Sequence, residues 1–170
     1  MIGEKTKAVE LFWQQCRKNF DIETSAYHAC SLADPRYLDP SVPNLDLSDH
    51  PRLIRSRRKN GTAHLEIDFG RTGVPRRAIG DYWLIVDFDS APLYLVRIID
   101  VLVFRFSDVP QSWAEVEGEG DCSLAWWRDA HRDYFSRQCA LWGIPWQEDL
   151  RVVCERWDLV ASADGDHVQA

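Results

Sequence analysis

The chain has 170 residues, enough for one well-buried domain and too few for two ordinary ones. Its hydrophobic fraction of 45%, with eight Trp, seven Phe and five Tyr, excludes global disorder. A formal net charge of −7 argues against a protein whose whole surface binds nucleic acid.

The cysteines and the absence of long apolar stretches indicate a cytoplasmic protein. Five Cys form an odd set with no C-x-x-C pair, which favours reduced thiols over a disulfide framework or a zinc ribbon. No stretch is typical of a signal peptide or a membrane span, so we expect no membrane partner. The five His show no ligand spacing with Cys or Asp, so we expect no metal and no cofactor. The oligomeric state is not indicated.

The first fifty residues are expected to form a helix and an irregular segment that pack on the domain. Residues 6–20 have apolar positions at helical spacing, with Thr6 as the N-cap. Residues 21–49 are rich in Pro, Asp and Ser, and Pro35, Pro40 and Pro43 exclude a long helix or strand. Such a segment is typical of a binding loop or of a surface insertion.

A basic helix and a strand are predicted next. Ser48 or Asp49 caps a helix that runs through Lys59, and Asn60-Gly61 is a helix stop because both residues tolerate the left-handed conformation. Residues 62–67 alternate like a half-buried strand. Lys59 and Thr62 can then meet in one pocket across the corner.

The basic charge is concentrated in this part of the chain. Residues 51–77 hold eight basic and two acidic residues, a net charge of +6, and the remainder carries −13. An acidic body with one basic edge can attract phosphate groups there. The alternative is a solvated helix face with salt bridges.

The second half of the chain alternates strands and helices. We expect a flexible basic loop at 70–77, strands at 82–88 and 93–106, a short helix at 108–117, a longer helix at 124–141 capped by Asp121 or Ser123, a strand at 150–160 and a disordered polar tail at 161–170. This order fits an α+β domain on a small curved sheet or barrel.

Several motifs resemble the ASCH domain, a branch of the PUA-like superfamily. They are K-x-x-T at 59–62, G-D-Y-W at 80–83, E-G-E-G-D-C-S-L-A-W-W at 117–127 and V-C-E-R-W at 153–157. The resemblance covers residues 51–160. It implies a small curved β-barrel of about five to six strands decorated with helices, and RNA or a modified nucleoside as partner.

The resemblance also implies a reaction. Some members hydrolyse RNA or acylated cytidine through a Lys, a Thr and a Glu, which match Lys59, Thr62 and Glu117 here. The family usually has Gly two residues before the Lys and Arg or Ser two after the Thr, where this chain has Arg57 and His64.

Our first hypothesis is a hydrolase with Thr62 as nucleophile, Lys59 as its base and Glu117 as proton donor or positioning group. A base role requires a lowered Lys pKa, whereas a direct ion pair with Glu117 would raise it. Each of the three residues also has a structural interpretation: Thr62 in a turn, Lys59 as a helix C-terminal charge or phosphate contact, and Glu117 as a helix-end carboxylate.

The alternative hypothesis is a non-catalytic RNA-binding module of the PUA-like type. Phosphate groups would contact exposed basic side chains, and one Trp of the consecutive pair would stack on a base because only one can point inward. The predicted nucleic-acid-binding residues are Arg55, Arg58, His64, Arg76, Arg77, Ser123 and Trp126. The structural interpretation is favoured for two of them: Ser123 as a helix cap and His64 as a satisfied strand histidine.

Overall fold

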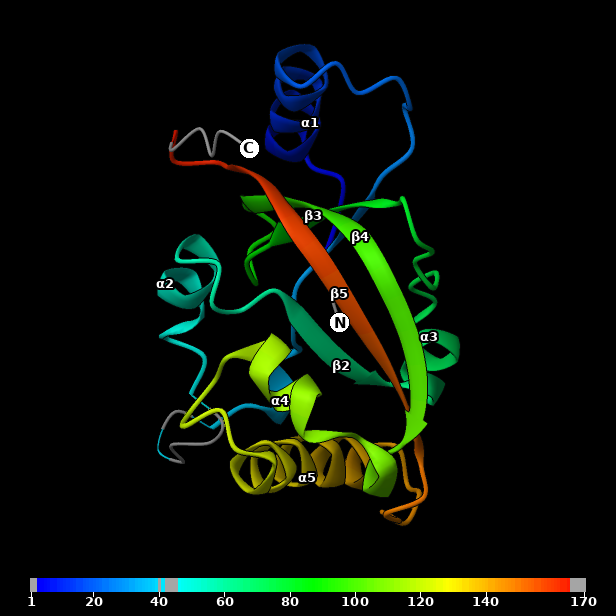
Figure 1. Ribbon diagram of the computed structural model, residues 1–170. Coiled ribbons are helices and arrows are strands. Elements are labelled where there is room, and N and C mark those ends of the chain that lie inside the picture. The colour runs from blue at the N-terminus through cyan, green and yellow to red at the C-terminus, as the bar shows by residue number, and fades with distance from the viewer. Residues whose placement is uncertain (1–2, 40, 42–45, 166–170) are drawn as a thin grey trace. The chain divides into compact units, whose positions relative to one another are not determined.

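A computed structural model describes residues 3–39, 41 and 46–165 (Figure 1). In chain order the elements are α1 (Lys7–Asn19), β1 (His28–Cys30), the 3-10 helix η1 (Pro35–Tyr37), α2 (His50–Arg55), β2 (Gly61–Leu65), α3 (Glu66–Thr72), β3 (Tyr82–Val86), β4 (Pro92–Arg105), the 3-10 helix η3 (Phe106–Asp108), α4 (Gln111–Glu117), α5 (Leu124–Leu141) and β5 (Arg151–Ser162).

The strands form a five-stranded sheet in the order β1-β3-β4-β5-β2. β1 runs parallel to β3, and β3 runs antiparallel to β4 with Leu84 opposite Leu95. The chain divides into two compact units, one of Met1–Asp34, Asp68–Val101 and Arg156–Ala170, and one of Pro35–Ile67 and Leu102–Glu155. β4 and β5 each contribute residues to both. The predicted α+β class is therefore confirmed.

In the first unit, α1 packs its apolar face on β3. Thr6 accepts a hydrogen bond from the Val9 amide at 3.2 Å, which confirms the predicted cap. Val9 and Trp13 are buried against Leu84 and Leu95, residues of the two central strands of this unit. The helical spacing of the apolar residues in the sequence explains this packing.

In the second unit, α4 and α5 cover one face of β2. Their core contains Ala63, Leu65, Trp113, Trp127 and Phe135. Gly61 faces the same way, because a Cβ added there would lie 2.4 Å from Cγ1 of Val116 on α4. Ser123 caps α5 by accepting from the Trp126 amide at 3.1 Å, as predicted.

The strand predicted at 62–67 was wrong in two respects. β2 ends at Leu65 and all five of its residues are buried, so the strand is covered on both faces and is not half-buried. Residues Glu66–Thr72 form α3, so residues 70–72 of the loop predicted at 70–77 are helical. Asp68 and Phe69 are the buried residues of this helix.

The basic helix ends earlier than predicted. α2 stops at Arg55, and the left-handed residue is Arg57 with a φ of 57°, not Asn60 or Gly61. The Leu53 carbonyl accepts from the amides of Arg58 and Lys59 at 2.9 and 3.0 Å, which closes the helix end. Lys59 therefore lies in the link between α2 and β2.

The other boundaries differ by a few residues. The predicted strand at 150–160 is β5, which runs on to Ser162, and the predicted short helix at 108–117 is divided into η3 and α4. A three-residue strand, β1, lies within the irregular segment 21–49. Residues 166–170 of the predicted tail are outside the described part of the chain.

Candidate functional site

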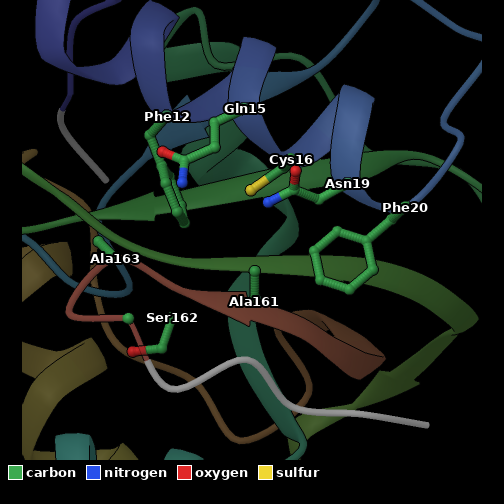
Figure 2. Close-up of a pocket in the computed structure, with 9 residues that line it drawn as sticks. Phe12, Gln15, Cys16, Asn19, Phe20, Ala161, Ser162 and Ala163 are labelled. Atoms are coloured by element: carbon green, nitrogen blue, oxygen red, sulfur yellow. The ribbon is translucent and has the colours of Figure 1, made fainter.

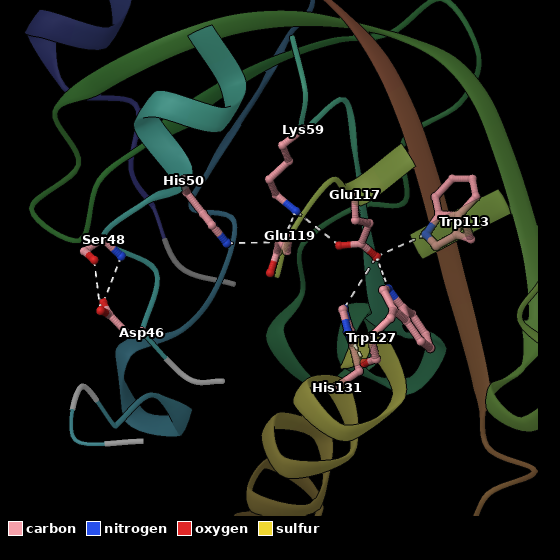
Figure 3. Close-up of polar contacts among 9 residues, drawn as sticks. All are labelled: Asp46, Ser48, His50, Lys59, Trp113, Glu117, Glu119, Trp127 and His131. Atoms are coloured by element: carbon pink, nitrogen blue, oxygen red, sulfur yellow. Dashed lines mark hydrogen bonds and ion pairs between the residues drawn. The ribbon is translucent and has the colours of Figure 1, made fainter. Parts of the chain in front are cut away.

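A buried ammonium group lies between two carboxylates in the second unit (Figure 3). The Lys59 side chain is 1% exposed. Its Nζ donates to Oε2 of Glu117 at 3.1 Å and also to Oε1 of Glu119. We call these three residues, together with His50 and His131, the Lys59 cluster.

The end of α4 brings both carboxylates to the same lysine. Gly118 follows Glu117 as the left-handed C-cap with a φ of 65°, so the chain reverses between Glu117 and Glu119. The turn packs on the link before β2, since a Cβ at Gly118 would lie 2.2 Å from the Arg58 carbonyl oxygen. The Asn60 amide donates to the Val116 carbonyl at 3.0 Å and fixes the same contact.

Glu117 accepts hydrogen bonds from three N–H donors, and the His131 imidazole lies beside it. Its Oε1 accepts from the indole Nε1 of Trp113 at 3.1 Å and of Trp127 at 2.7 Å. His131 Nε2 lies 3.5 Å from the same oxygen, and Lys59 binds Oε2. The carboxylate is 1% exposed, so these groups replace the water that it would otherwise bind.

Glu119 is the more accessible of the two carboxylates. Its side chain is 14% exposed, and His50 Nε2 lies 3.1 Å from its Oε1. Burial alone would raise the pKa of Glu119, but the charges of Lys59 and His50 lower it well below the ordinary value. Glu119 is therefore ionised over the neutral range.

The ion pairs with the two carboxylates also change the pKa of Lys59. Burial alone would lower the pKa of Lys59, but the carboxylates of Glu119 and Glu117 outweigh it and raise that pKa above the ordinary value. Lys59 is thus held as an ammonium. This direction is opposite to the one that a general base requires.

The structure joins Lys59 and Glu117 but does not add Thr62 to them. In the described residues, no hydrogen bond links Thr62 to the Lys59 cluster. Gly61, Ala63 and Leu65 face α4 and α5, so strand alternation directs Thr62 and His64 to the opposite face of β2. Both side chains are buried, and His64 Nε2 lies 3.8 Å from Oε2 of Glu155.

The predicted nucleic-acid-binding residues of the second unit lie in different environments. Arg55 and Arg58 are exposed. Arg58 Nη2 donates to the Gly120 carbonyl at 3.3 Å and to Sγ of Cys122 at 3.1 Å, which places this guanidinium on the loop that carries Glu119. Trp126 is half-buried against Gly120, whereas Trp127 is buried.

The two predicted arginines of the first unit differ from each other. Arg76 is exposed, whereas Arg77 is 2% exposed. The Arg77 guanidinium carbon lies 3.9 Å from the ring centroid of Trp83, and Nη1 donates to Sγ of Cys30 at 3.2 Å. A phosphate contact needs an accessible guanidinium, so this burial speaks against that role for Arg77.

Sequence reasoning missed Glu119, His50 and His131. Glu119 stands two residues after Glu117 in the same motif, and a glycine between two carboxylates is a signal that both can turn to one partner. His131 follows Trp127 by one helical turn, and its Nδ1 lies 3.0 Å from the Trp127 carbonyl oxygen. His50 had no sequence signal that links it to residue 119.

A small cavity in the first unit lies between α1 and the end of β5 (Figure 2). Its volume is about 70 Å³, and Phe12, Cys16, Phe20 and Ala161 are among its lining residues. Burial raises the pKa of the Cys16 thiol to about 11, which keeps it protonated and unreactive. We assign no site to this cavity.

Comparisons with known proteins identify the family. The ASCH domain model matches residues 46–161. The chain belongs to the ASCH family. A crystal structure of an ASCH domain from Lactobacillus crispatus is similar at 27% identity, with a TM-score of 0.67 over 92% of this chain and 98% of that one. The predicted membership and the PUA-like fold are confirmed.

A second solved structure supports the fold alone. A protein from Enterococcus faecalis is 21% identical, with a TM-score of 0.75 over 96% of this chain and 98% of that one. No curated protein matches the chain. Within the described ranges, no helix is long and apolar enough to cross a membrane, and no group of three or more His, Cys, Asp and Glu side chains could hold a metal ion.

Proposed function

We propose that this ASCH protein is a hydrolase that acts on RNA or on a modified, acylated nucleoside. The Lys59 cluster is the centre of the site. Water is the proposed nucleophile, because Thr62, the residue predicted for that role, lies on the opposite face of β2. The observation that carries the proposal is the convergence of one ammonium and two carboxylates in a nearly water-free environment.

Stability alone gives little reason for such a cluster. Burying charges costs desolvation free energy, and a well-packed apolar set of similar volume is often as stable or more stable. Buried ionisable groups with specific partners therefore favour a functional role. The two indoles and the two imidazoles that surround the carboxylates fix their orientation before any ligand arrives.

The roles within the site follow from the charges. Lys59 is proposed to hold Glu117 and Glu119 in place and to present positive charge to a developing oxyanion. Glu119, at the accessible side, is proposed to bind N–H or O–H groups of the ligand. Because Lys59 is kept protonated, the base that activates the nucleophile must be another group.

Turnover of acylated cytidine and of RNA oligomers by the purified protein is the direct test. We expect hydrolysis by the parent and a loss of about 10²-fold or more in Lys59→Ala and Glu119→Gln. Thr62→Val separates attack by Thr62 from attack by water, since only the first requires its hydroxyl. Absence of hydrolysis of both substrates by the parent would refute the hydrolase.

RNA binding without catalysis is a second candidate, favoured by a specific feature of α2 and the link after it. Arg52, Arg55, Arg57 and Arg58 are all exposed there. Arg58 also contacts the loop after Glu119, so bound phosphate groups would lie next to the Lys59 cluster. Phosphate contacts of this kind fix position without reading sequence.

The salt dependence of RNA affinity tests this candidate. The logarithm of affinity for single-stranded RNA should fall by about 0.7 per phosphate contact for each unit of log salt concentration. Arg55→Gln and Arg57→Gln should each make this slope shallower, whereas Arg97→Gln, at an exposed position on β4, should not. Salt-independent binding, or equal effects of all three variants, would exclude phosphate recognition by these arginines.

A further inference from the structure

His50 is the member of the Lys59 cluster with one ring nitrogen that has no hydrogen-bond partner among the described residues (Figure 3). Its side chain is 12% exposed, and Nε2 lies 3.1 Å from Oε1 of Glu119. Its Nδ1 is buried and has no hydrogen-bond partner within the described part of the chain. A buried polar atom without a partner costs free energy, so its position calls for a ligand or water.

The protonation pattern of the imidazole follows from its neighbours. Glu119 is ionised and can only accept hydrogen bonds, so Nε2 carries the proton that it donates to Oε1. In the neutral ring, Nδ1 then carries a lone pair and is a proton acceptor. A carboxylate that orients one ring nitrogen while the other faces the reaction is the arrangement that activates hydroxyl nucleophiles.

We propose that His50, oriented by Glu119, is the general base of the reaction, and that Lys59 acts as the residue that positions Glu119. This inference rests on the proposed hydrolase function. It assigns to His50 the role that sequence reasoning gave to Lys59.

The proton transfer balances in two steps. The attacking water gives one proton to Nδ1 as its oxygen forms a bond to the acyl carbon, and the acyl group leaves as the carboxylic acid. The imidazolium is stabilised by the Glu119 carboxylate. It then returns the proton to the amine nitrogen as the carbon–nitrogen bond breaks, so the neutral imidazole and Glu119 are regenerated.

His131, the other imidazole of the cluster, does not offer the same geometry. Its Nδ1 lies 3.0 Å from the Trp127 carbonyl oxygen, and its Nε2 lies 3.5 Å from Glu117 Oε1. Both nitrogens therefore already face protein acceptors. Glu117, which His131 contacts, is also the less exposed carboxylate.

The charged groups that act on His50 set the pH dependence of the reaction. They are Glu119, Lys59 behind it, and Asp49, which precedes His50 and is paired with Arg52 at 2.7 Å between Oδ1 and Nε. Protonation of the imidazole would remove the base, so activity should fall on the acidic side with one ionisation. That ionisation should disappear when His50 is replaced.

The kinetic test compares His50→Gln with His28→Gln, using N4-acetylcytidine as the probe. His28 is a matched control because its Nε2 also lies 3.0 Å from a carboxylate, that of Asp81, outside the Lys59 cluster. We expect kcat of His50→Gln to fall by about 10²–10⁴-fold with KM changed much less, and His28→Gln to match the parent. Added imidazole should restore part of the activity of His50→Gly.

A spectroscopic measurement on the parent separates a base from a structural histidine. Nitrogen-15 NMR of labelled histidine should show His50 with Nε2 protonated and Nδ1 bare at neutral pH. The opposite tautomer, or an active parent with an equally active His50→Gln, would overturn this inference alone. A parent that does not hydrolyse the probe or RNA would overturn the hydrolase proposal and the base role with it.

Discussion

Replacing Lys59 with methionine is expected to lower the free energy of unfolding by about 3–5 kcal/mol, the usual effect of removing one partner from a buried ion pair. Methionine keeps a long unbranched side chain, so the packing changes little. Glu117 and Glu119 would then lie side by side without the ammonium that both contact. The loss comes from the carboxylates that remain, because they are deprived of water as well as of their counter-ion.

Chemical denaturation of the variant and of matched controls measures this loss. Lys18→Met, at an exposed position of α1, should change the free energy of unfolding by no more than about 0.5 kcal/mol. The double variant Lys59→Met/Glu119→Gln should recover part of the loss because it removes one of the two uncompensated charges. A deficit below about 1 kcal/mol in Lys59→Met would contradict a desolvated cluster.

The loss of unfolding free energy in Lys59→Met should also depend on pH. The pKa of Glu119 is lowered from 4.5, so its contribution is present above that value and is lost as the pH falls through its folded-state pKa. The pKa of Lys59 is raised from 10.5, so its contribution is present below that value and is lost at higher pH. Without Lys59, Glu119 takes up a proton more readily, and the loss of stability in Lys59→Met should shrink in acid.

Replacing Gly118 with alanine is expected to cost about 2–4 kcal/mol through two separate effects. The backbone has a φ of 65°, which an alanine adopts only with strain. The added Cβ would also lie 2.2 Å from the Arg58 carbonyl oxygen and 2.7 Å from its carbonyl carbon, and backbone atoms cannot move aside without shifting the link before β2. Glu117, Glu119 and Lys59 would all be displaced.

Gly143→Ala separates strain from the close approach. Gly143 has a φ of 67°, and nothing lies within 4 Å of an added Cβ there. This control should cost only about 1 kcal/mol, the backbone part of the effect. Thermal or chemical unfolding of the two variants gives the comparison, and equal losses would mean that the turn does not pack on Arg58. Turnover by Gly118→Ala should fall along with its stability.

Local patterns predicted most of the helices and strands. The spacing of apolar residues at 6–20 and 124–141 located α1 and α5, and the capping residues Thr6 and Ser123 were correct because a cap depends only on residues three positions away. The boundary between β2 and α3 was missed because the polar–apolar alternation of the sequence continues through Glu66 and Ile67, which already belong to α3.

One contact of the predicted site is present, and the roles of its residues stay a prediction. Lys59 and Glu117 do meet, as the family motifs implied. The placement of Thr62 with them was an inference from a helix that was expected to end at Lys59, and the earlier end at Arg55 changes the direction of the link. Arg77 was assigned to the surface from its charge alone, and its stacking on Trp83 could not be read from that charge.

Local periodicity and short motifs in the sequence were enough to predict the α+β class and the family. The contact between Lys59 and Glu117, which are 58 residues apart, was an expectation from the family motifs that the structure bears out. The tertiary structure alone decided that a second carboxylate, 60 residues from Lys59, and the imidazole of His50 complete the cluster. The physical reason is that burial sets the protonation of each group. A group's burial and counter-ions depend on which distant segments fold against it.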